Sequence, residues 1–299
     1  MPASPATGLC ETLAPDLRRL IAPNPSPMTY WGTNTYLLGR RALAVIDPGP
    51  DDPRHLAAIL AAVPPGGSIS HILVTHAHLD HSPLSRPLSQ VTGAPILAYG
   101  DAQAGRSPVM QALAAQGMQG GGEGVDAAFV PDICLADGAV IENAEWRLQA
   151  LHSPGHFCNH LCFLGAGFGF SGDHVMGWSS TLISPPDGDL GDYLRSLTRL
   201  TAHMPRILYP GHGAPVTDPA ERIAALAAHR AERHAQIRAA LARGPSTAPA
   251  LAAALYHEIP PALLGAASRN VFAHLIELVQ ENAAKAENPL HPLTVFAPL

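Results

Sequence analysis

Lysine and cysteine are both scarce in this chain of 299 residues. Only one of its 18 lysine and arginine residues is a lysine, Lys285, and the formal net charge is −6. This acidic balance argues against an extended basic surface for nucleic acid, while a local basic groove stays compatible with it. The four cysteines include no CxxC pair, so the sequence predicts no disulfide scaffold. We expect Cys158 and Cys162 to be buried structural thiols.

Long apolar runs are missing as well. No segment approaches the ~18 continuous apolar residues of a membrane span, and residues 1–20 lack the basic head and apolar stretch of a signal peptide. Because 47% of the residues are hydrophobic and 14% are charged, the composition predicts a folded chain with a substantial core. We therefore expect a soluble cytoplasmic protein that does not enter a membrane. The sequence does not indicate an oligomeric state.

The order of predicted elements divides the chain into two parts. Before residue 218, short apolar runs alternate with turns and helical stretches. The predicted strands and hairpins cover residues 33–39, 42–49, 68–76, 94–100, 139–154, 160–174 and 206–213, and the predicted helices cover 55–63 and 188–203. After Asp218 the pattern predicts helices and a short extended tail. We therefore predict a larger domain over 1–218 and a small, mainly helical one over 219–299.

Glycine and alanine dominate residues 100–128, with the densest glycines at 117–124. No Gly-Lys-Ser/Thr sequence follows, so this is not a phosphate-binding loop. A loose surface connection is the favoured interpretation, and a lid over a site is the alternative.

A dense group of coordinating side chains follows the predicted strand 68–76. The stretch HILVTHAHLDHSP contains His76, His78, Asp80 and His81. Because alternate side chains of an extended segment share a face, His76 and His78 are able to hold one ion together. Asp80 and His81, beyond the turn, are placed to hold a second. Zn²⁺ takes about four ligands, so the group requires partners from elsewhere in the chain.

Three other predicted strand ends supply those partners. His156 lies in HSPGH, Asp173 in FSGDH and His212 in YPGHG. Each stands close to a glycine, which lets the backbone turn sharply. We expect the remaining histidines, including His160, to be structural. His174, directly after Asp173, is expected to hydrogen-bond behind the ligands.

The order of these motifs resembles the metallo-β-lactamase fold superfamily over roughly residues 28–215. GTNTYLLG (32–39) and VIDPG (45–49) are similar to its opening strands. The resemblance implies an α/β fold, a four-layer αβ/βα sandwich, with the metal site at one edge between the two sheets.

Carried over residue by residue, the resemblance also implies a ligand set for two divalent ions. One ion would be held by His76, His78 and His156, the other by Asp80, His81 and His212, with Asp173 bridging both. True β-lactamases generally have a cysteine where Asp173 stands, so the set favours the hydrolase branch typified by glyoxalase II and the nucleases. Zn²⁺ is the favoured metal, and such a site also accepts Mn²⁺ or Fe. The implied enzyme uses a metal-bridging hydroxide, with Asp80 as a catalytic residue that orients the nucleophile or relays a proton.

The second half of the chain is similar to the β-lactamase-like protein 2 group, in which the sandwich carries a winged-helix-like C-terminal domain. This similarity favours a phosphodiester substrate such as single-stranded RNA. The arginines that would then form a basic stripe are Arg222, Arg230, Arg233, Arg238 and Arg243. Because Glu221 and Glu232 are interspersed, an ordinary solvated helix face is the preferred interpretation.

Two other activities stay open on sequence grounds. A glyoxalase II-like hydrolase of thioesters or small esters is the main alternative to the phosphodiesterase. A persulfide dioxygenase with a single iron is less favoured, because the two-metal ligand set is complete.

Overall fold

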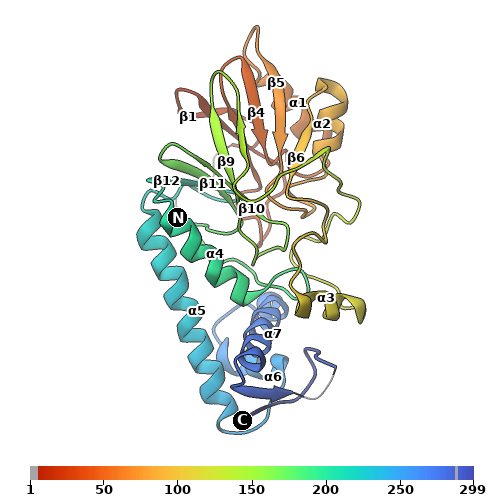
Figure 1. Ribbon diagram of the computed structural model, residues 1–299, viewed down its shortest axis with the longest axis vertical. Helices are drawn as coiled ribbons and strands as arrows, with labels where there is room; N and C mark the ends of the chain where they lie inside the picture. Colours follow the sequence, from red (N-terminus) through yellow and green to blue (C-terminus); the bar gives the residue numbers. More distant parts are fainter. Residues whose placement is uncertain (1–5, 287–288) are drawn as a thin grey trace.

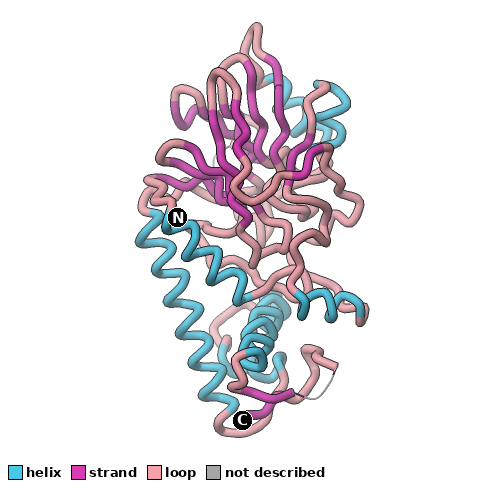
Figure 2. The backbone as a smooth tube through the Cα atoms, viewed as in Figure 1, coloured by secondary structure: helices cyan, strands magenta, loops and turns pink. Residues whose placement is uncertain are grey.

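A computed structural model describes residues 6–286 and 289–299 of the chain. Two β-sheets form the upper part of the molecule, and helices dominate the lower part (Figures 1 and 2). The first sheet contains, in spatial order, β1 (Glu11–Ala14), β2 (Leu17–Ile21), β3 (Asn34–Leu38), β4 (Ala42–Ile46), β5 (Ser68–Leu73), β6 (Ile96–Ala98) and β7 (Ile133–Cys134). The second contains β12 (Ile207–Pro210), β11 (Phe168–Gly172), β10 (Leu161–Gly165), β9 (Arg147–His152) and β8 (Val140–Glu142).

The two sheets face each other across an apolar layer. Tyr36 and Ile46 point into this layer from the first sheet, and Leu148 and Phe163 from the second. Successive side chains of a strand point to opposite faces, so the alternate residues pack outward against helices. This alternation explains why both faces of each sheet are apolar.

Helices cover the two outer faces and complete a four-layer sandwich. The helices α1 (Pro53–Ala61) and α2 (Ser85–Thr92) share a core with the first sheet. The helix α4 (Leu190–Ala202) and the first half of α5 (Pro219–Leu241) share another with the second sheet. The predicted four-layer αβ/βα fold is therefore confirmed.

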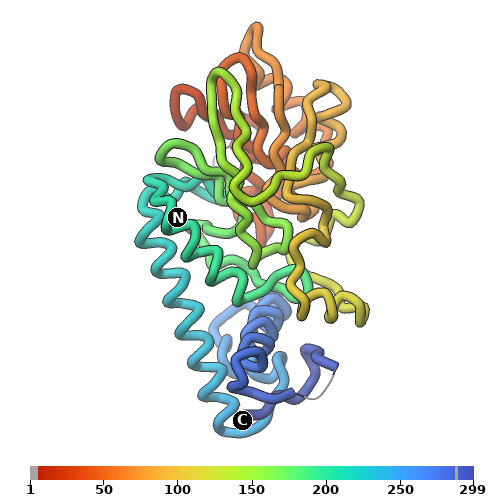
Figure 3. The backbone as a smooth tube through the Cα atoms, in the orientation of Figure 1, coloured from red at the N-terminus to blue at the C-terminus, as the bar shows by residue number. Residues whose placement is uncertain are grey.

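The remaining elements form a separate apolar cluster below the sandwich. They are α3 (Pro108–Ala115), α6 (Ala248–Leu255), α7 (Leu264–Gln280) and the hairpin of β13 (Ala284–Ala286) and β14 (Phe296–Pro298). A short 3₁₀ turn (Pro261–Leu263) leads directly into α7. Met110 and Leu113 of α3 pack in this cluster. The colours in Figure 3 show how far the segment of α3 is from the C-terminal helices in the sequence. The C-terminal helices are therefore covered in part by the larger segment.

The helix α5 belongs to both parts of the molecule. It begins at Pro219, and the Asp218 side chain accepts a hydrogen bond from Glu221 N at 2.9 Å, the cap that the sequence predicts. Ile223 and Leu226 lie in the core beneath the second sheet, whereas Ile237 lies in the C-terminal cluster. The domain division at residue 218 stays a prediction, because this one helix continues through both cores.

Several elements escaped the sequence analysis. The hairpin β1–β2 precedes the first predicted strand, and α2 has the sequence SRPLSQVT, in which polar residues and a proline hide the helical pattern. The helix α3 lies within the glycine- and alanine-rich stretch. Its apolar face becomes meaningful only against the C-terminal cluster, which is distant in the sequence.

Candidate metal centre

The predicted ligands come from four separate segments that meet at one edge of the sandwich. The loop after β5 carries His76, His78, Asp80 and His81, and Asp173 stands directly after β11. The loop between β9 and β10 provides His156, and His212 follows β12. The structure therefore brings together every predicted ligand, and all of these side chains are buried. Their roles as ligands stay predictions.

The first group consists of His76, His78 and His156, whose donor atoms lie within 4.8 Å of one another. The Nδ1 atom of His78 lies 2.9 Å from His76 Nε2 and 3.2 Å from His156 Nε2. Three imidazole nitrogens that converge in this way form a donor set that suits a divalent transition metal.

The second group consists of Asp80, His81 and His212. The Nε2 atom of His212 lies 3.1 Å from Asp80 Oδ2 and 3.3 Å from His81 Nε2. The glycine of YPGHG is required here, because a Cβ atom at Gly211 would collide with the Asp173 carboxylate. That glycine lets β12 bring His212 to the cluster.

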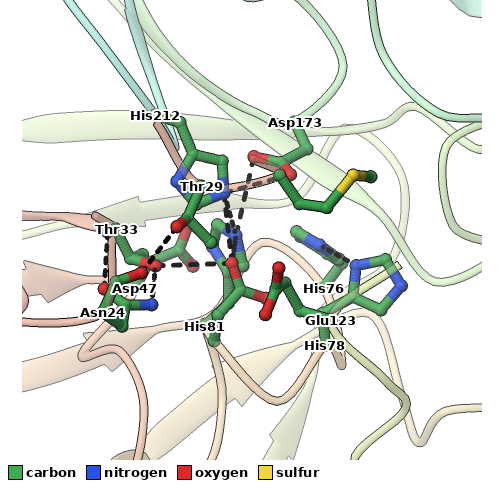
Figure 4. A network of polar contacts seen from close by, with 12 residues as sticks. Asn24, Thr29, Thr33, Asp47, His76, His78, His81, Glu123, Asp173 and His212 are labelled. Atoms are coloured by element: carbon green, nitrogen blue, oxygen red, sulfur yellow. Dashed lines mark hydrogen bonds and ion pairs between the residues drawn. The ribbon is translucent and has the colours of Figure 1, made fainter. Parts of the chain in front are cut away.

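Asp173 lies between the two groups. Its Oδ2 atom is 3.3 Å from His212 Nε2 and 3.6 Å from His156 Nε2, and its Oδ1 atom is 3.5 Å from His81 Nε2. Figure 4 shows Asp173 and His212 pointing toward each other near His81, with His76 and His78 alongside. One carboxylate therefore reaches both groups, which is the placement that a bridging ligand requires.

Two buried oxygen atoms test whether the residues suit metal ions. Asp80 Oδ1 and Asp173 Oδ1 have no hydrogen-bond partner among the described residues. A buried carboxylate oxygen without a partner is costly, and a cation that shares these donors removes the cost. The donor set therefore fits two divalent ions, one at each group.

The pKa values of the ligand histidines shift in opposite directions in the two groups, because burial dominates in the first group and nearby carboxylates dominate in the second. Burial lowers the pKa of His78 to about 3 and that of His76 well below its ordinary value, which keeps both rings in the neutral, metal-binding form. Burial also opposes the charge on His212, but the Asp173 and Asp80 carboxylates outweigh it and raise its pKa to about 10. Without metal ions, protons therefore take the place of cations at the second group.

Neighbouring polar groups orient the ligand rings, and the sequence analysis missed them. Asp47 Oδ2 lies 3.0 Å from His81 Nδ1, and Asp47 Oδ1 accepts a hydrogen bond from Thr75 N at 2.7 Å. Backbone carbonyls contact the outer nitrogens of two other rings: Leu182 O lies 2.7 Å from His156 Nδ1, and Gly32 O lies 3.2 Å from His212 Nδ1. Such contacts fix the tautomer that faces the metal. Asp47 lies in VIDPG, which the sequence indicates only as part of an opening strand.

His174 does not make the hydrogen bond that the sequence analysis expects. Neither of its ring nitrogens has a partner among the described residues, although the side chain is fully buried. Its ring instead packs edge-on against Tyr193, with 4.8 Å between the ring centroids.

The arginines of the predicted basic stripe are mostly occupied by contacts within the protein. Arg230 is buried, and Arg222 donates to the carbonyls of Met176 and Ser179. The Arg233 guanidinium stacks 4.0 Å above the Tyr256 ring. These arginines therefore form neither a continuous basic stripe nor an ordinary solvated helix face.

The glycine-rich loop packs against the site. The carbonyl of Gly124 accepts a hydrogen bond from Leu79 N at 3.0 Å, and that of Gln119 accepts one from Arg269 Nη1 at 2.9 Å. The Ser26 hydroxyl donates to Glu123 Oε1 at 2.7 Å, which joins two loops near the ligands. The structure therefore differs from the loose connection that the sequence analysis favours.

A cavity of about 230 Å³ opens above the ligands. Its polar floor includes His78, Asp80, His156, Asp173 and His212. The remaining wall is largely apolar, and it is formed by Pro27, Met28, Gly122, Glu123, Met176, Trp178, Ser179, Ser180, Leu182, Tyr256, Ile259, Leu263, Ala266, Ala267 and Asn270.

Comparison with known proteins decides the family. Residues 28–212, which include every predicted ligand, match the family model described as metallo-beta-lactamase superfamily. The chain belongs to the metallo-β-lactamase superfamily. Residues 247–288 match the beta-lactamase associated winged helix domain, so both parts of the predicted architecture are confirmed.

Relatives of known sequence or structure match most of this chain. A beta-lactamase-like protein 2 homolog of Drosophila melanogaster is 31% identical over 283 residues, which are 88% of this chain and 87% of that protein. An atrochrysone carboxyl ACP thioesterase of Aspergillus terreus is 29% identical over 237 residues, 78% of this chain but only 65% of that protein. The crystal structure of a metallo-beta-lactamase family protein from Thermus thermophilus has a TM-score of 0.76 and 27% identity, and the match covers 96% of this chain and 100% of that one.

These matches and the ligand cluster identify the chain as a metal-dependent hydrolase of the superfamily. They leave the metal and the substrate to be proposed from the site itself.

Proposed function

We propose that this protein hydrolyses the thioester of an apolar acyl group, with two divalent ions, preferably Zn²⁺, at the candidate metal centre. One observation carries the proposal. The wall of the cavity above the ligands is largely apolar, and no lysine or arginine stands among the described residues that line it. An uncharged acyl chain gains about 25 cal/mol for each Å² of apolar surface that it buries in such a cavity.

The apolar wall has contributions from both parts of the chain. Tyr256, Ile259 and Leu263 approach from the C-terminal domain, and Trp178 approaches from the loop after β11. The Arg233 guanidinium lies over the Tyr256 ring and thereby supports that wall. The acyl group would therefore lie between the two domains with its carbonyl carbon above the metal ligands.

A phosphodiester in single-stranded RNA is the second candidate, and the charges near the cavity argue against it. Binding of RNA requires several contacts from cationic side chains to phosphates. The cavity offers instead a carboxylate, Glu123, and Arg222 and Arg230 are hydrogen-bonded to backbone carbonyls. A neutral thioester avoids this unfavourable charge.

The bound ions would supply a hydroxide nucleophile at neutral pH and a positive charge beside the acyl oxygen. Asp80 is placed to steer the attacking oxygen, because its Oδ2 atom is near His212 and His81 while its Oδ1 atom is free of protein partners in the described chain. The Thr33 hydroxyl contacts Asp80 Oδ2 at 3.3 Å and holds the carboxylate in this orientation. The Asp80 carboxylate would accept the proton of the nucleophile and pass it to the departing thiolate.

The relative from Aspergillus terreus supports the proposal, because its name assigns it a thioesterase activity on a carrier-protein-bound acyl group. Since the chain spans only 65% of that protein, the specific acyl group is not carried over.

A substrate screen with the metal-loaded enzyme tests the proposal. We expect kcat/KM for S-acyl-N-acetylcysteamine thioesters to rise roughly fourfold with each added methylene until the cavity is full, because each methylene contributes about 0.8 kcal/mol. Bis-p-nitrophenyl phosphate, short single-stranded RNA, S-lactoylglutathione and a chromogenic β-lactam serve as comparison substrates. Faster turnover of RNA or the phosphodiester than of every thioester would refute the proposal.

A variant that narrows the cavity tests where the acyl group lies. We expect Ala266→Phe to lower kcat/KM about tenfold for the longest accepted thioester, by roughly 1.4 kcal/mol, and to leave the acetyl thioester almost unchanged. The matched control is Ala262→Phe, an exposed position outside the cavity lining. An equal loss for short and long acyl groups would place the acyl chain elsewhere.

A further inference from the structure

The loop between β11 and α4 is held by side chains from the C-terminal helices. Residues 176–184 of this loop include part of the cavity wall, and the Leu182 carbonyl faces His156. On the α5 side, Arg222 Nη2 donates to Ser179 O at 2.6 Å. On the α7 side, Arg269 Nη1 donates to Ser184 Oγ at 3.1 Å. The loop is therefore fastened to both helices.

Arg230 makes the most deeply buried of these contacts. Its side chain is only 1% exposed, and its Nη2 atom donates to the carbonyl of Thr181. The guanidinium lies 5.6 Å from the centre of the Tyr193 ring, and no carboxylate pairs with it among the described residues. Burying a cation without a counterion is expensive, so a hydrophobic residue would be the more stabilising occupant of this position. The contact to Thr181 therefore suggests a role other than stability.

Asn270 of α7 links Arg230 to the next residues of the same loop. Its Oδ1 atom accepts a hydrogen bond from Arg230 Nη1 at 3.2 Å and another from Ile183 N at 3.0 Å. One amide oxygen therefore joins α5, α7 and the loop. The backbone on both sides of Leu182 is held by this arrangement.

The held segment is the one that orients His156. Leu182 O lies 2.7 Å from His156 Nδ1, and Thr181 Oγ1 lies 2.9 Å from the same nitrogen. Because a carbonyl oxygen only accepts hydrogen bonds, His156 Nδ1 carries the proton. The Nε2 lone pair of His156 is then directed toward His78 and Asp173.

We propose that Arg230 and Asn270 are positioning residues for one half of the metal centre. They fix the Thr181–Ile183 backbone, which in turn fixes the tautomer and direction of His156. The C-terminal domain thereby controls the affinity of the ion held by His76, His78 and His156. The ion at Asp80, His81 and His212 receives no such support, because its outer contacts come from Asp47 and Gly32 of the sandwich. This proposal does not depend on the identity of the substrate.

Titration of metal-free full-length protein with Co²⁺, monitored by visible absorption and by competition with a chelating dye, tests the proposal. We expect Arg230→Met to raise one of the two dissociation constants roughly 10- to 100-fold. This is the effect of removing an outer hydrogen-bond partner of a metal ligand. The other constant should stay within about twofold of the parent value. The matched control is Arg238→Met, the same substitution at an exposed position of α5, for which both constants should stay unchanged.

Two variants of Asn270 provide the same test if Arg230→Met does not fold. Asn270→Leu removes the acceptor shared by Arg230 and Ile183 and should also weaken one constant. Asn270→Asp keeps an acceptor oxygen at position 270, so both dissociation constants should equal those of the parent protein. Equal weakening of both ions in Asn270→Leu, or no change in either, would overturn the proposal, because general damage to the fold has no reason to select one ion.

Discussion

Replacing Asp173 by asparagine is expected to abolish hydrolysis and to release metal from both halves of the centre. The carboxylate lies 3.3 Å from His212 and 3.6 Å from His156, so one substitution removes a negative charge shared by the two groups. An amide keeps the shape of the side chain but neither the charge nor the second acceptor oxygen. If the ions contribute several kcal/mol to the transition state, kcat/KM should fall roughly 1,000-fold or more.

Elemental analysis and steady-state kinetics measure this outcome. The parent protein should contain about two metal ions per chain, as two-metal hydrolases of this kind do. The variant should contain fewer than one after dialysis. Asp51→Asn, the same change at an exposed aspartate, should retain both metal and activity. Full metal content and turnover in the Asp173 variant would exclude a bridging role for this carboxylate.

Removing the metal ions is expected to lower the thermal stability strongly and to make it depend on pH. A ligand present at 1,000 times its dissociation constant stabilises the folded state by about 4 kcal/mol per site. For two sites in a chain of this size, the midpoint of unfolding should fall by roughly 10 °C or more on chelation. Differential scanning calorimetry with and without a chelator measures the difference.

The direction of the pH dependence follows from His212. In the metal-free protein burial opposes its charge, yet Asp173 and Asp80 raise its pKa to about 10 from an unfolded value of about 6.5. The protonated ring therefore stabilises the metal-free fold fully below about pH 6.5, and this contribution is lost as the pH rises through about 10. The metal-loaded protein should lack that alkaline decline, because cations replace the proton.

Metal binding should release these protons. Loading at pH 7.5 is expected to displace about two protons from His81 and His212, since the pKa values of both rings are raised in the metal-free protein. About one further proton should leave the water that becomes hydroxide. Calorimetric titrations in buffers with different heats of ionisation count the protons released. A release close to zero would mean that metal ions do not occupy the second group.

The histidine and aspartate pattern was sufficient to predict where the ligands meet, although it lies in four distant segments. His76, His78, Asp80 and His81 are adjacent in sequence, and His156, Asp173 and His212 each stand at a strand end next to or near a glycine. Strand ends converge at the edge of a sheet, so local sequence carries this information. The short apolar runs between turns were likewise sufficient to predict most strands of the two sheets.

The substrate cavity was not predictable from the sequence. Tyr256 and Leu263 are ordinary apolar residues of a helical domain, and only the docking of that domain places them above the ligands. The contacts of the arginines of α5 were not predictable from the sequence either. Their spacing permitted a basic stripe, whereas the fold buries Arg230 and turns Arg222 toward backbone carbonyls.

The sequence by itself therefore determined the candidate metal ligands, through their side-chain chemistry and their places near strand ends, and it indicated the family and the layered fold through the resemblance of its motifs. Only the tertiary structure decided which groups orient those ligands and what surrounds the substrate. His156 illustrates the difference. The motif HSPGH predicts it as a metal ligand, but its tautomer depends on a carbonyl 26 residues away that α5 and α7 hold in place. Contacts of that kind are made by backbone atoms, which are identical in every residue and leave no mark in the sequence.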